Sequence, residues 1–207
     1  MSMNQGAALI ALGANMPHSG ASLPETIRAA IAAVQAAGLQ VVAQSRLYST
    51  PCFPPGAGPD YVNAATSLAG DLAPEEMLAL CHRIEADLGR RRDSRWASRG
   101  VDIDLLAAGD RILPDRATQA HWRSLPLDAQ MRDWPDGLIL PHPRMAERAF
   151  VLIPLAEIAP SWRHPATGLD VATMAAALPE PEKAALQPFL RPFGGDERLS
   201  RRVDAPK

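Results

Sequence analysis

The sequence predicts an α/β (α+β) fold in which a small sheet carries helices packed on one face. Segments typical of strands alternate along the chain with segments whose apolar residues recur every three or four positions, so strands and helices are interleaved. Only about four segments have clear strand character, which limits the size of the sheet. One face of such a sheet gives the helices a surface against which to bury their apolar stripes.

The first part of the chain contains two predicted strands and a helix between them. Residues Ala7–Gly13 form an apolar run that ends in glycine, which is typical of a buried strand followed by a turn. Ser22 and Glu25 have the spacing of a capping box at the start of a helix, and Gly38 ends that helix. Residues 39–48 mix β-branched and polar types and are predicted to form the second strand.

The middle of the chain predicts a long loop, a strand, a helix and another strand. Residues 50–60 are too rich in proline and glycine for regular structure, and a loop of this length in a compact domain is either disordered or functional. Residues 61–68 return to strand character. A helix begins at Pro74 and ends at Gly89, and residues 101–107 form a short strand.

The last part of the chain is less regular and sets the expected domain boundaries. The polar stretch 108–137 contains prolines and predicts no regular element, whereas the apolar segment after it predicts a short helix. We expect one domain over residues 1–178, with an insertion near 109–136. Proline, arginine, glycine and aspartate dominate the end of the chain, so a partly disordered tail is expected over 179–207.

Composition excludes several classes of protein. Of 207 residues, 47% are apolar and the net charge is −2, so the chain is globular and has no overall positive charge with which to hold nucleic acid. Lys183 and Lys207 are its two lysines, which excludes a catalytic lysine in the main body. The first residues do not resemble a signal peptide, and no apolar run is long enough to span a membrane. We expect a cytoplasmic monomer that binds neither nucleic acid nor a membrane.

Asp102 and Asp104 form the first candidate site. Side chains alternate along a strand, so Val101, Ile103 and Leu105 enter the core while the two aspartates share the other face, about 6.5 Å apart. Two carboxylates this close repel each other unless a cation lies between them. Mg²⁺ suits that place, because it prefers oxygen ligands and takes one or two protein carboxylates together with substrate phosphates. Taken alone, such a pair is more typical of an edge strand with a solvated acidic face.

The residues just before this strand favour a phosphate ligand. Trp96 lies there among five arginines, which are Arg90, Arg91, Arg92, Arg95 and Arg99. A guanidinium group matches phosphate oxygens with a rigid fork of donors and keeps its charge. Arginines beside an acidic pair suit a metal-bridged polyphosphate, and therefore phosphoryl transfer. The chain has no G-x-x-x-x-G-K-[ST] motif, so the arginines and the metal must hold the phosphates.

Four sequence blocks identify a family resemblance. They are ALIALGAN near the N-terminus, PDYVNAA at 59–65, RWASRGVDIDLL at 95–106 and LILPHPRMAERAFVLIPLAEIAP at 138–160. In this order they resemble the 6-hydroxymethyl-7,8-dihydropterin pyrophosphokinase family over residues 7–178. The resemblance implies a ferredoxin-like fold with a mainly antiparallel sheet. It also implies transfer of pyrophosphate from ATP, the co-substrate, to the hydroxymethyl group of the pterin in folate biosynthesis, which leaves AMP.

The resemblance assigns the nucleotide side of the site. It implies that Asp102 and Asp104 bind two Mg²⁺ ions, and that Arg90 and Arg99 contact the phosphates and assist the transfer. The resemblance also implies further ATP contacts, which are His82, Glu85, Arg92, Arg95, Trp96, His142 and Arg148. At the position of His82 the family often has glutamine.

The resemblance also assigns the pterin side. Tyr61 and Phe150 match the aromatic pair that encloses the flat ring, and Asn63 matches the residue that hydrogen-bonds its edge. These types suit the ligand, because an aromatic face stacks on a heterocycle and an amide offers both a donor and an acceptor. The adjoining loop residues are Thr50, Pro51 and Phe53.

The chain departs from the family pattern at several places. Ser98 stands where the family commonly has proline, and Gly100 where threonine is common, which predicts a looser closing loop. The insertion 109–136 replaces a much shorter connection, and the residues alone predict no chemistry for it.

Two other functions fit the residues less completely. One is a nucleotide-sugar glycosyltransferase, which also uses two aspartates with a metal but needs a larger, Rossmann-like sheet. The other is a protein that binds a nucleotide or a pterin without turnover.

Overall fold

The computed structural model describes residues 7–17, 20–52, 58–89, 100–126, 129 and 132–189, and all structural statements concern these residues. Their elements, in chain order, are β1 (Ala7–Ala14), α1 (Leu23–Ala36), β2 (Gln40–Gln44), β3 (Tyr48–Thr50), β4 (Tyr61–Ala69), α2 (Pro74–Asp87), β5 (Asp102–Ala108), α3 (Arg116–Ser124), the 3₁₀ helix η1 (Met145–Glu147), α5 (Ala149–Ile158), α6 (Val171–Ala176), α7 (Glu180–Ala184) and β6 (Gln187–Pro188). Within the described ranges, no helix is long and apolar enough to cross a membrane.

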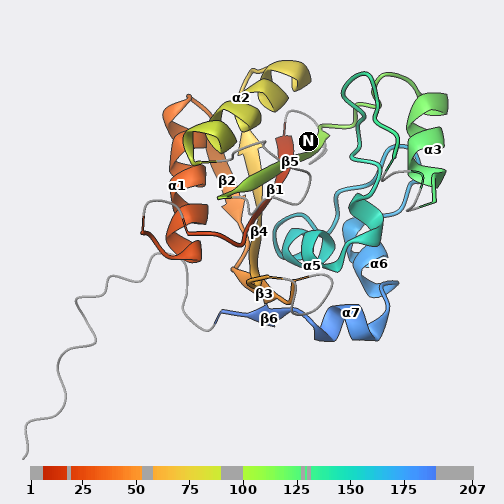
Figure 1. Cartoon of the computed structure of the whole chain (residues 1–207). Coiled ribbons are helices and arrows are strands. Elements are labelled where there is room, and N and C mark those ends of the chain that lie inside the picture. Colours follow the sequence, from red (N-terminus) through yellow and green to blue (C-terminus); the bar gives the residue numbers. More distant parts are fainter. Residues whose placement is uncertain are drawn as a thin grey trace, which may run out of the picture.

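The strands form one sheet in the order β5-β1-β4-β3-β6, with β2 pairing with a further part of β4 (Figure 1). Every strand pairing in the described part of the chain is antiparallel. This confirms the predicted α/β, ferredoxin-like arrangement with a mainly antiparallel sheet. It also differs from the parallel Rossmann-like sheet that the glycosyltransferase alternative requires.

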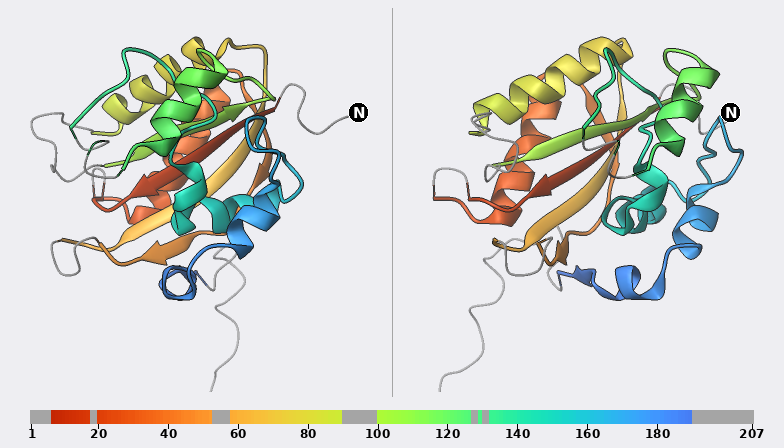
Figure 2. Two further views of the ribbon diagram at one scale, coloured as in Figure 1. Left: turned by 90° about the vertical axis from the view of Figure 1, so that its right-hand side faces the viewer. Right: turned by 45° about the vertical axis from the view of Figure 1, so that its right-hand side comes forward.

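Helices cover both faces of the sheet, not one as the sequence predicts. Helices α1 and α2 pack on one face and α5 on the other, as Figure 2 shows from two sides. Strand β4 explains the difference, because it is buried along almost its whole length. Its second face carries Asn63, Ala65 and Ser67, which are too small or too polar to predict a covering helix, yet Ala65 packs in the same cluster as residues of α5.

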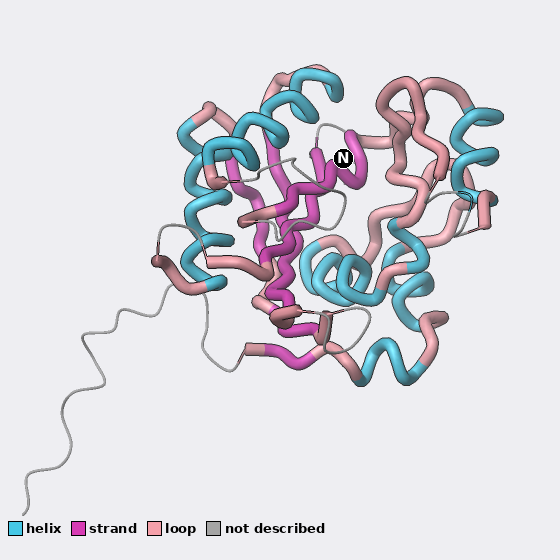
Figure 3. The backbone as a smooth tube through the Cα atoms, viewed as in Figure 1, coloured by secondary structure: helices cyan, strands magenta, loops and turns pink. Residues whose placement is uncertain are grey.

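Helix α3, among the described residues of the insertion, is a regular element that the sequence does not predict. Helix α3 begins after Asp115, whose Oδ1 accepts hydrogen bonds from the backbone N–H groups of Ala117 at 2.8 Å and Thr118 at 2.9 Å. Figure 3 shows this helix to one side of the sheet. The helix has few apolar residues to form a recognisable apolar stripe, so the capping aspartate is its clearest sequence signal.

The C-terminal part remains structured beyond residue 178. Helix α7 leads into β6, and β6 pairs with β3 through Tyr48 opposite Pro188 and Ser49 opposite Gln187. Residues 190–207 lie outside the described ranges.

Candidate active site

The register of the three central strands places the two halves of the predicted site. Gly13 of β1 lies opposite Asn63 of β4 and, on its other side, opposite Asp102 of β5. Residues directly opposite in antiparallel strands share a face, and neighbouring strands are about 4.8 Å apart, so Asn63 and Asp102 lie about 10 Å apart on one face. A Cβ atom at Gly13 would lie 3.2 Å from Asn63 Oδ1. Glycine at this position therefore leaves room for the amide.

The two aspartates share a face of β5, as strand alternation predicts. Val101, Ile103 and Leu105 are buried in the core on the side of α1 and α2. Asp102 and Asp104 are partly exposed on the opposite side of the strand, and Asp104 lies opposite Ala11 of β1. The pair therefore has the accessibility that a ligand-binding carboxylate pair needs.

Glu85 has a structural contact that the sequence did not predict. It lies on α2 with only 1% of its surface exposed, and its Oε1 accepts a hydrogen bond of 2.8 Å from the backbone N–H of Ile103. Ile103 separates the two aspartates, so this bond holds the strand at the point where they are presented. Contact of Glu85 with ATP stays a prediction, as does that of His82, which is exposed on the same helix.

Arg148 links the candidate metal site to the candidate pterin site. Its Nη1 lies 3.2 Å from Asp104 Oδ2, in a hydrogen-bonded ion pair. Its guanidinium carbon lies 5.7 Å from the centre of the Phe150 ring, in cation–π geometry. The Phe150 side chain is 38% exposed at the start of α5. Helix α5 thus brings an arginine and an aromatic ring to the exposed end of the aspartate pair.

His142 lies beside the same strand and is held through its backbone. Its N–H donates to the carbonyl oxygen of Leu106 at 2.8 Å. Its Nδ1 accepts the N–H of Arg144 at 3.2 Å, which leaves Nε2 as the ring donor in the neutral form. Burial lowers the pKa of the imidazole, although the charge of Asp104 acts in the other direction. In its neutral form, a histidine that donates from Nε2 suits an acceptor on a nucleotide.

Of the other predicted pterin residues that the structure describes, Thr50 ends β3, Pro51 follows it, and Tyr61 and Asn63 lie on β4. Tyr61 pairs with Thr50, and Asn63 Nδ2 donates to Thr50 Oγ1 at 2.9 Å in a buried contact. Tyr61 and Asn63 are two residues apart on β4 and so share a face, as predicted. Pro51 is exposed directly after Thr50.

Several predicted site residues lie outside the described ranges, so their roles stay predictions. They are Phe53, Arg90, Arg92, Arg95, Trp96 and Arg99.

The donor set fits Mg²⁺ better than a metal held by protein alone. The described residues contain no group of three or more His, Cys, Asp or Glu side chains placed to hold a metal ion. The pair Asp102 and Asp104 matches the Mg²⁺ pattern, in which a few carboxylates bind the ion and substrate phosphates complete its shell.

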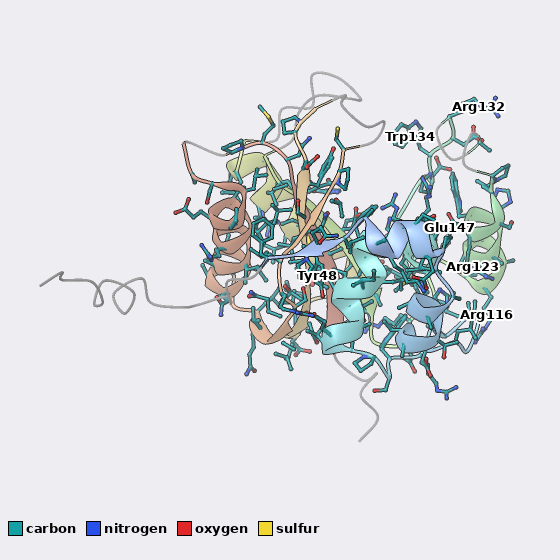
Figure 4. The ribbon with its side chains drawn as sticks, turned by 90° about the horizontal axis from the view of Figure 1, so that it is seen from below. Tyr48, Arg116, Arg123, Arg132, Trp134 and Glu147 are labelled. Atoms are coloured by element: carbon teal, nitrogen blue, oxygen red, sulfur yellow. The ribbon has the colours of Figure 1, made fainter. Side chains whose placement is uncertain are left out.

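One polar cluster behind the site was not predicted. Glu157 of α5 accepts hydrogen bonds from Tyr48 Oη at 2.5 Å and from Arg46 Nε at 2.7 Å. Burial, and then the hydrogen bond to Glu157, raises the pKa of Tyr48 to about 12. Figure 4 shows Tyr48 beside α5. The cluster fixes α5 on the strand that carries Thr50, and residues more than 100 positions apart offer no local sequence signal for it.

The antiparallel sheet with paired aspartates, an arginine and an exposed aromatic ring near one face has the features expected of a small phosphotransferase. The family model described as 7,8-dihydro-6-hydroxymethylpterin-pyrophosphokinase (HPPK) matches residues 9–160. The chain therefore belongs to the 7,8-dihydro-6-hydroxymethylpterin-pyrophosphokinase family.

Similar proteins extend over most of the chain. The 2-amino-4-hydroxy-6-hydroxymethyldihydropteridine pyrophosphokinase of Synechocystis sp. is 36% identical over 79% of this chain and 72% of its own length. The proteins of the same name from Methylorubrum extorquens and Pseudomonas aeruginosa are 37% and 35% identical, over 74% and 82% of this chain and 82% and 90% of their own lengths. These matches confirm the family resemblance of the four sequence blocks.

The fold is also similar to that of a larger protein. The crystal structure of Plasmodium falciparum HPPK-DHPS aligns with 82% of this chain at a TM-score of 0.59 and 14% identity. The alignment covers 44% of that protein, so this chain spans less than half its length. At this identity the likeness shows the fold alone.

Proposed function

We propose that this chain transfers pyrophosphate from ATP to the hydroxymethyl group of 6-hydroxymethyl-7,8-dihydropterin in folate biosynthesis, which gives the pterin diphosphate and AMP. Membership of the pyrophosphokinase family supports the reaction. The observation that carries the assignment to this site is the contact of Arg148 with both Asp104 and Phe150, because it joins a carboxylate suited to metal with a ring suited to the pterin.

The pterin binds between Tyr61 and Phe150 in this proposal. Two aromatic faces favour a flat heterocycle, and the Asn63 amide pairs with its donor and acceptor edge. The hydrogen bond from Asn63 Nδ2 to Thr50 Oγ1 orients that amide before the ligand arrives. A preoriented amide loses little conformational freedom on binding, so it contributes both affinity and orientation.

The triphosphate binds over the exposed face of β5. Asp102 and Asp104 would hold two Mg²⁺ ions, which supply positive charge that neutralises the phosphate oxygens and orients them. Arg148 is already paired with Asp104, so its guanidinium lies close enough to contact a phosphate beside that carboxylate. His142 donates from Nε2 to the nucleotide, and Arg90 and Arg99 contact the phosphates.

The register of the sheet then presents one substrate to the other. The pterin hydroxyl oxygen attacks the β-phosphorus, the bond from that phosphorus to the α-phosphate oxygen breaks, AMP leaves, and the hydroxyl proton is released. The alignment of Asn63 and Asp102 across Gly13 supports this geometry, because the proposed pterin contact and the proposed metal ligand then lie on one face, on the two strands that flank β1. Positioning and electrostatic stabilisation carry the catalysis.

A product assay tests the proposal. The protein is incubated with ATP, Mg²⁺ and 6-hydroxymethyl-7,8-dihydropterin, and the nucleotide products are separated. We expect AMP, and we expect Asp102→Ala and Asp104→Ala each to lower turnover by at least about 100-fold. Asp110→Ala is the matched control, because Asp110 is exposed at the turn after the same strand. ADP as the product, or full turnover in both variants, would contradict the proposal. Binding of ATP and pterin without AMP would identify a binding protein instead.

A further inference from the structure

The insertion 109–136 contacts the segment that carries His142. Leu113 and Leu140 form an isolated antiparallel bridge, with hydrogen bonds of 2.9 Å from Leu113 N to Leu140 O and 3.1 Å from Leu140 N to Leu113 O. The start of the insertion is therefore attached two residues before His142. This attachment is made by the backbone and does not depend on the side chains of α3.

A second attachment comes from the helix of the insertion. Gln119 of α3 is fully buried, at 0% exposure, and its Nε2 donates a hydrogen bond of 3.2 Å to the carbonyl oxygen of Pro141. Its Oε1 accepts no hydrogen bond among the described residues. Burial of an amide is costly when one of its polar atoms is left unpaired, and an apolar side chain at this position would avoid that cost. The presence of glutamine here therefore points to its hydrogen bond with Pro141 O as the reason for an amide at this position.

The other side of this segment is held by β5. The His142 N–H donates to Leu106 O, and Leu106 is two residues beyond Asp104 on the same strand. The peptide between Pro141 and His142 is thus held at both ends: its carbonyl oxygen accepts from the insertion and its nitrogen donates to the strand of the aspartates. Fixing both groups of one peptide limits its rotation, and this rotation determines where the His142 side chain points.

We propose that Gln119 is a positioning residue for nucleotide binding, which fixes the peptide before His142 and so aims the His142 ring at ATP. The inference rests on the proposed contact of His142 with ATP. It gives the insertion a function in this chain, because helix α3 supports the His142 segment from the side. In a chain with a short connection in place of the insertion, the backbone of that connection would have to give this support.

Helix α3 contains a matched control for this proposal. Arg116 Nη1 donates to the carbonyl oxygen of Pro165 at 3.2 Å, so it attaches the same helix to the turn before α6 and not to the His142 segment. Arg116 and Arg123 lie where α3 faces the neighbouring helices in Figure 4. Arg116→Met therefore loosens α3 without removing the bond to Pro141, whereas Gln119→Met removes that bond with little change in side-chain length.

Binding measurements separate positioning from simple stability. The dissociation constants of a non-hydrolysable ATP analogue with Mg²⁺, and of the pterin, are measured for the wild type, Gln119→Met, Arg116→Met, His142→Ala and the Gln119→Met/His142→Ala double variant, with the melting temperature of each. We expect Gln119→Met to raise the dissociation constant of the ATP analogue roughly three- to tenfold and to leave that of the pterin unchanged. Arg116→Met should leave both affinities unchanged, and the double variant should bind the analogue no more weakly than His142→Ala.

Three outcomes would overturn the inference. They are wild-type ATP affinity in Gln119→Met, an equal loss in Arg116→Met, and multiplied losses in the double variant. If Gln119→Met does not fold, Gln119→Asn replaces it, because its shorter amide cannot reach Pro141 and the same results are expected. Formation of AMP by the wild type is measured in parallel. AMP formation with unchanged affinity in Gln119→Met rejects this inference alone, whereas failure to form AMP rejects the proposed function.

Discussion

Asn63 and Asp102 lie opposite the same residue, Gly13, on the two strands that flank β1. The spacing between the candidate pterin contact and the candidate metal ligand is therefore set by hydrogen bonds within the sheet. Loops can move by several ångströms, but neighbouring strands keep a nearly constant separation. Transfer between two bound substrates requires such a fixed spacing, because an error of about 1 Å lowers the rate strongly.

Gly13→Ala is expected to weaken pterin binding. The added Cβ would lie 3.2 Å from Asn63 Oδ1, so the amide must move by a few tenths of an ångström and lose its alignment with Thr50. We expect KM for the pterin to rise about three- to tenfold, with a smaller change in KM for ATP. Steady-state kinetics check this. Gly137→Ala is the control, since no atom lies within 4 Å of its added Cβ. Equal pterin KM values in Gly13→Ala and the wild type would refute the prediction.

Arg148→Met is expected to affect both substrates. The variant loses the ion pair with Asp104 and the cation–π contact with Phe150, because one guanidinium group makes both contacts. We expect kcat/KM for ATP to fall by about 100-fold and the affinity for the pterin to fall by a smaller factor. Arg163→Met, on the turn between α5 and α6, is the charge-matched control. Kinetics that resemble the control would mean that Arg148 does not join the two sites.

His164 should make the protein less stable at acidic pH. Its side chain is 1% exposed, and burial lowers its pKa to about 4. Well above pH 6.5 the histidine is neutral in both the folded and the unfolded state and causes no pH dependence. Between pH 6.5 and pH 4 only the unfolded chain binds the proton, so the free energy of unfolding falls as the pH falls. This histidine should account for roughly 2 to 3 kcal/mol of the loss between pH 7 and pH 4.5.

Urea unfolding at the two pH values measures this loss. Because carboxylates also contribute to it, the wild type is compared with His164→Gln, whose loss should be smaller by that amount. The same loss in both proteins would show that His164 takes up its proton in the folded state.

Gly100→Thr introduces the residue that is common in the family, and it should destabilise this chain. An added Cβ would lie 2.3 Å from the carbonyl oxygen of Leu88, at the end of α2, so backbone must move. Glycine here serves a close approach of two chain segments, which explains one departure from the family pattern. We expect a loss of about 1–3 kcal/mol in the free energy of unfolding, measured in urea. Gly137→Thr should cost less, and an unchanged stability of Gly100→Thr would contradict this explanation.

Local patterns in the sequence predict the helices and strands that bury one regularly spaced stripe of apolar side chains. Helix α1 begins after Ser22, whose N–H donates to Glu25 Oε2 at 2.7 Å, as the capping pattern indicates. Strand β5 and the exposure of its aspartates follow from alternation alone. Helix α3 and strand β6 do not, because α3 is mostly polar and β6 is stabilised by pairing with β3, which is distant in sequence.

In the candidate site too, local sequence patterns predict some features and not others. The aspartate pair and the Tyr61–Asn63 pair are spaced within single strands, so the residues themselves reveal a shared face. The alignment of Asn63 with Asp102 depends on the register of three strands, and the burial of Gln119 depends on where the insertion packs. No local sequence pattern indicates this alignment or this burial.

The position of β5 has a consequence for association. It is the last strand on its side of the sheet, and such a strand offers unpaired backbone groups to any extended chain. Here Glu85 accepts the Ile103 N–H and the His142 N–H binds the Leu106 carbonyl, so outward groups at both ends of the strand are already taken. The contacts that hold β5 at the candidate site thereby also occupy backbone groups with which another extended chain could pair.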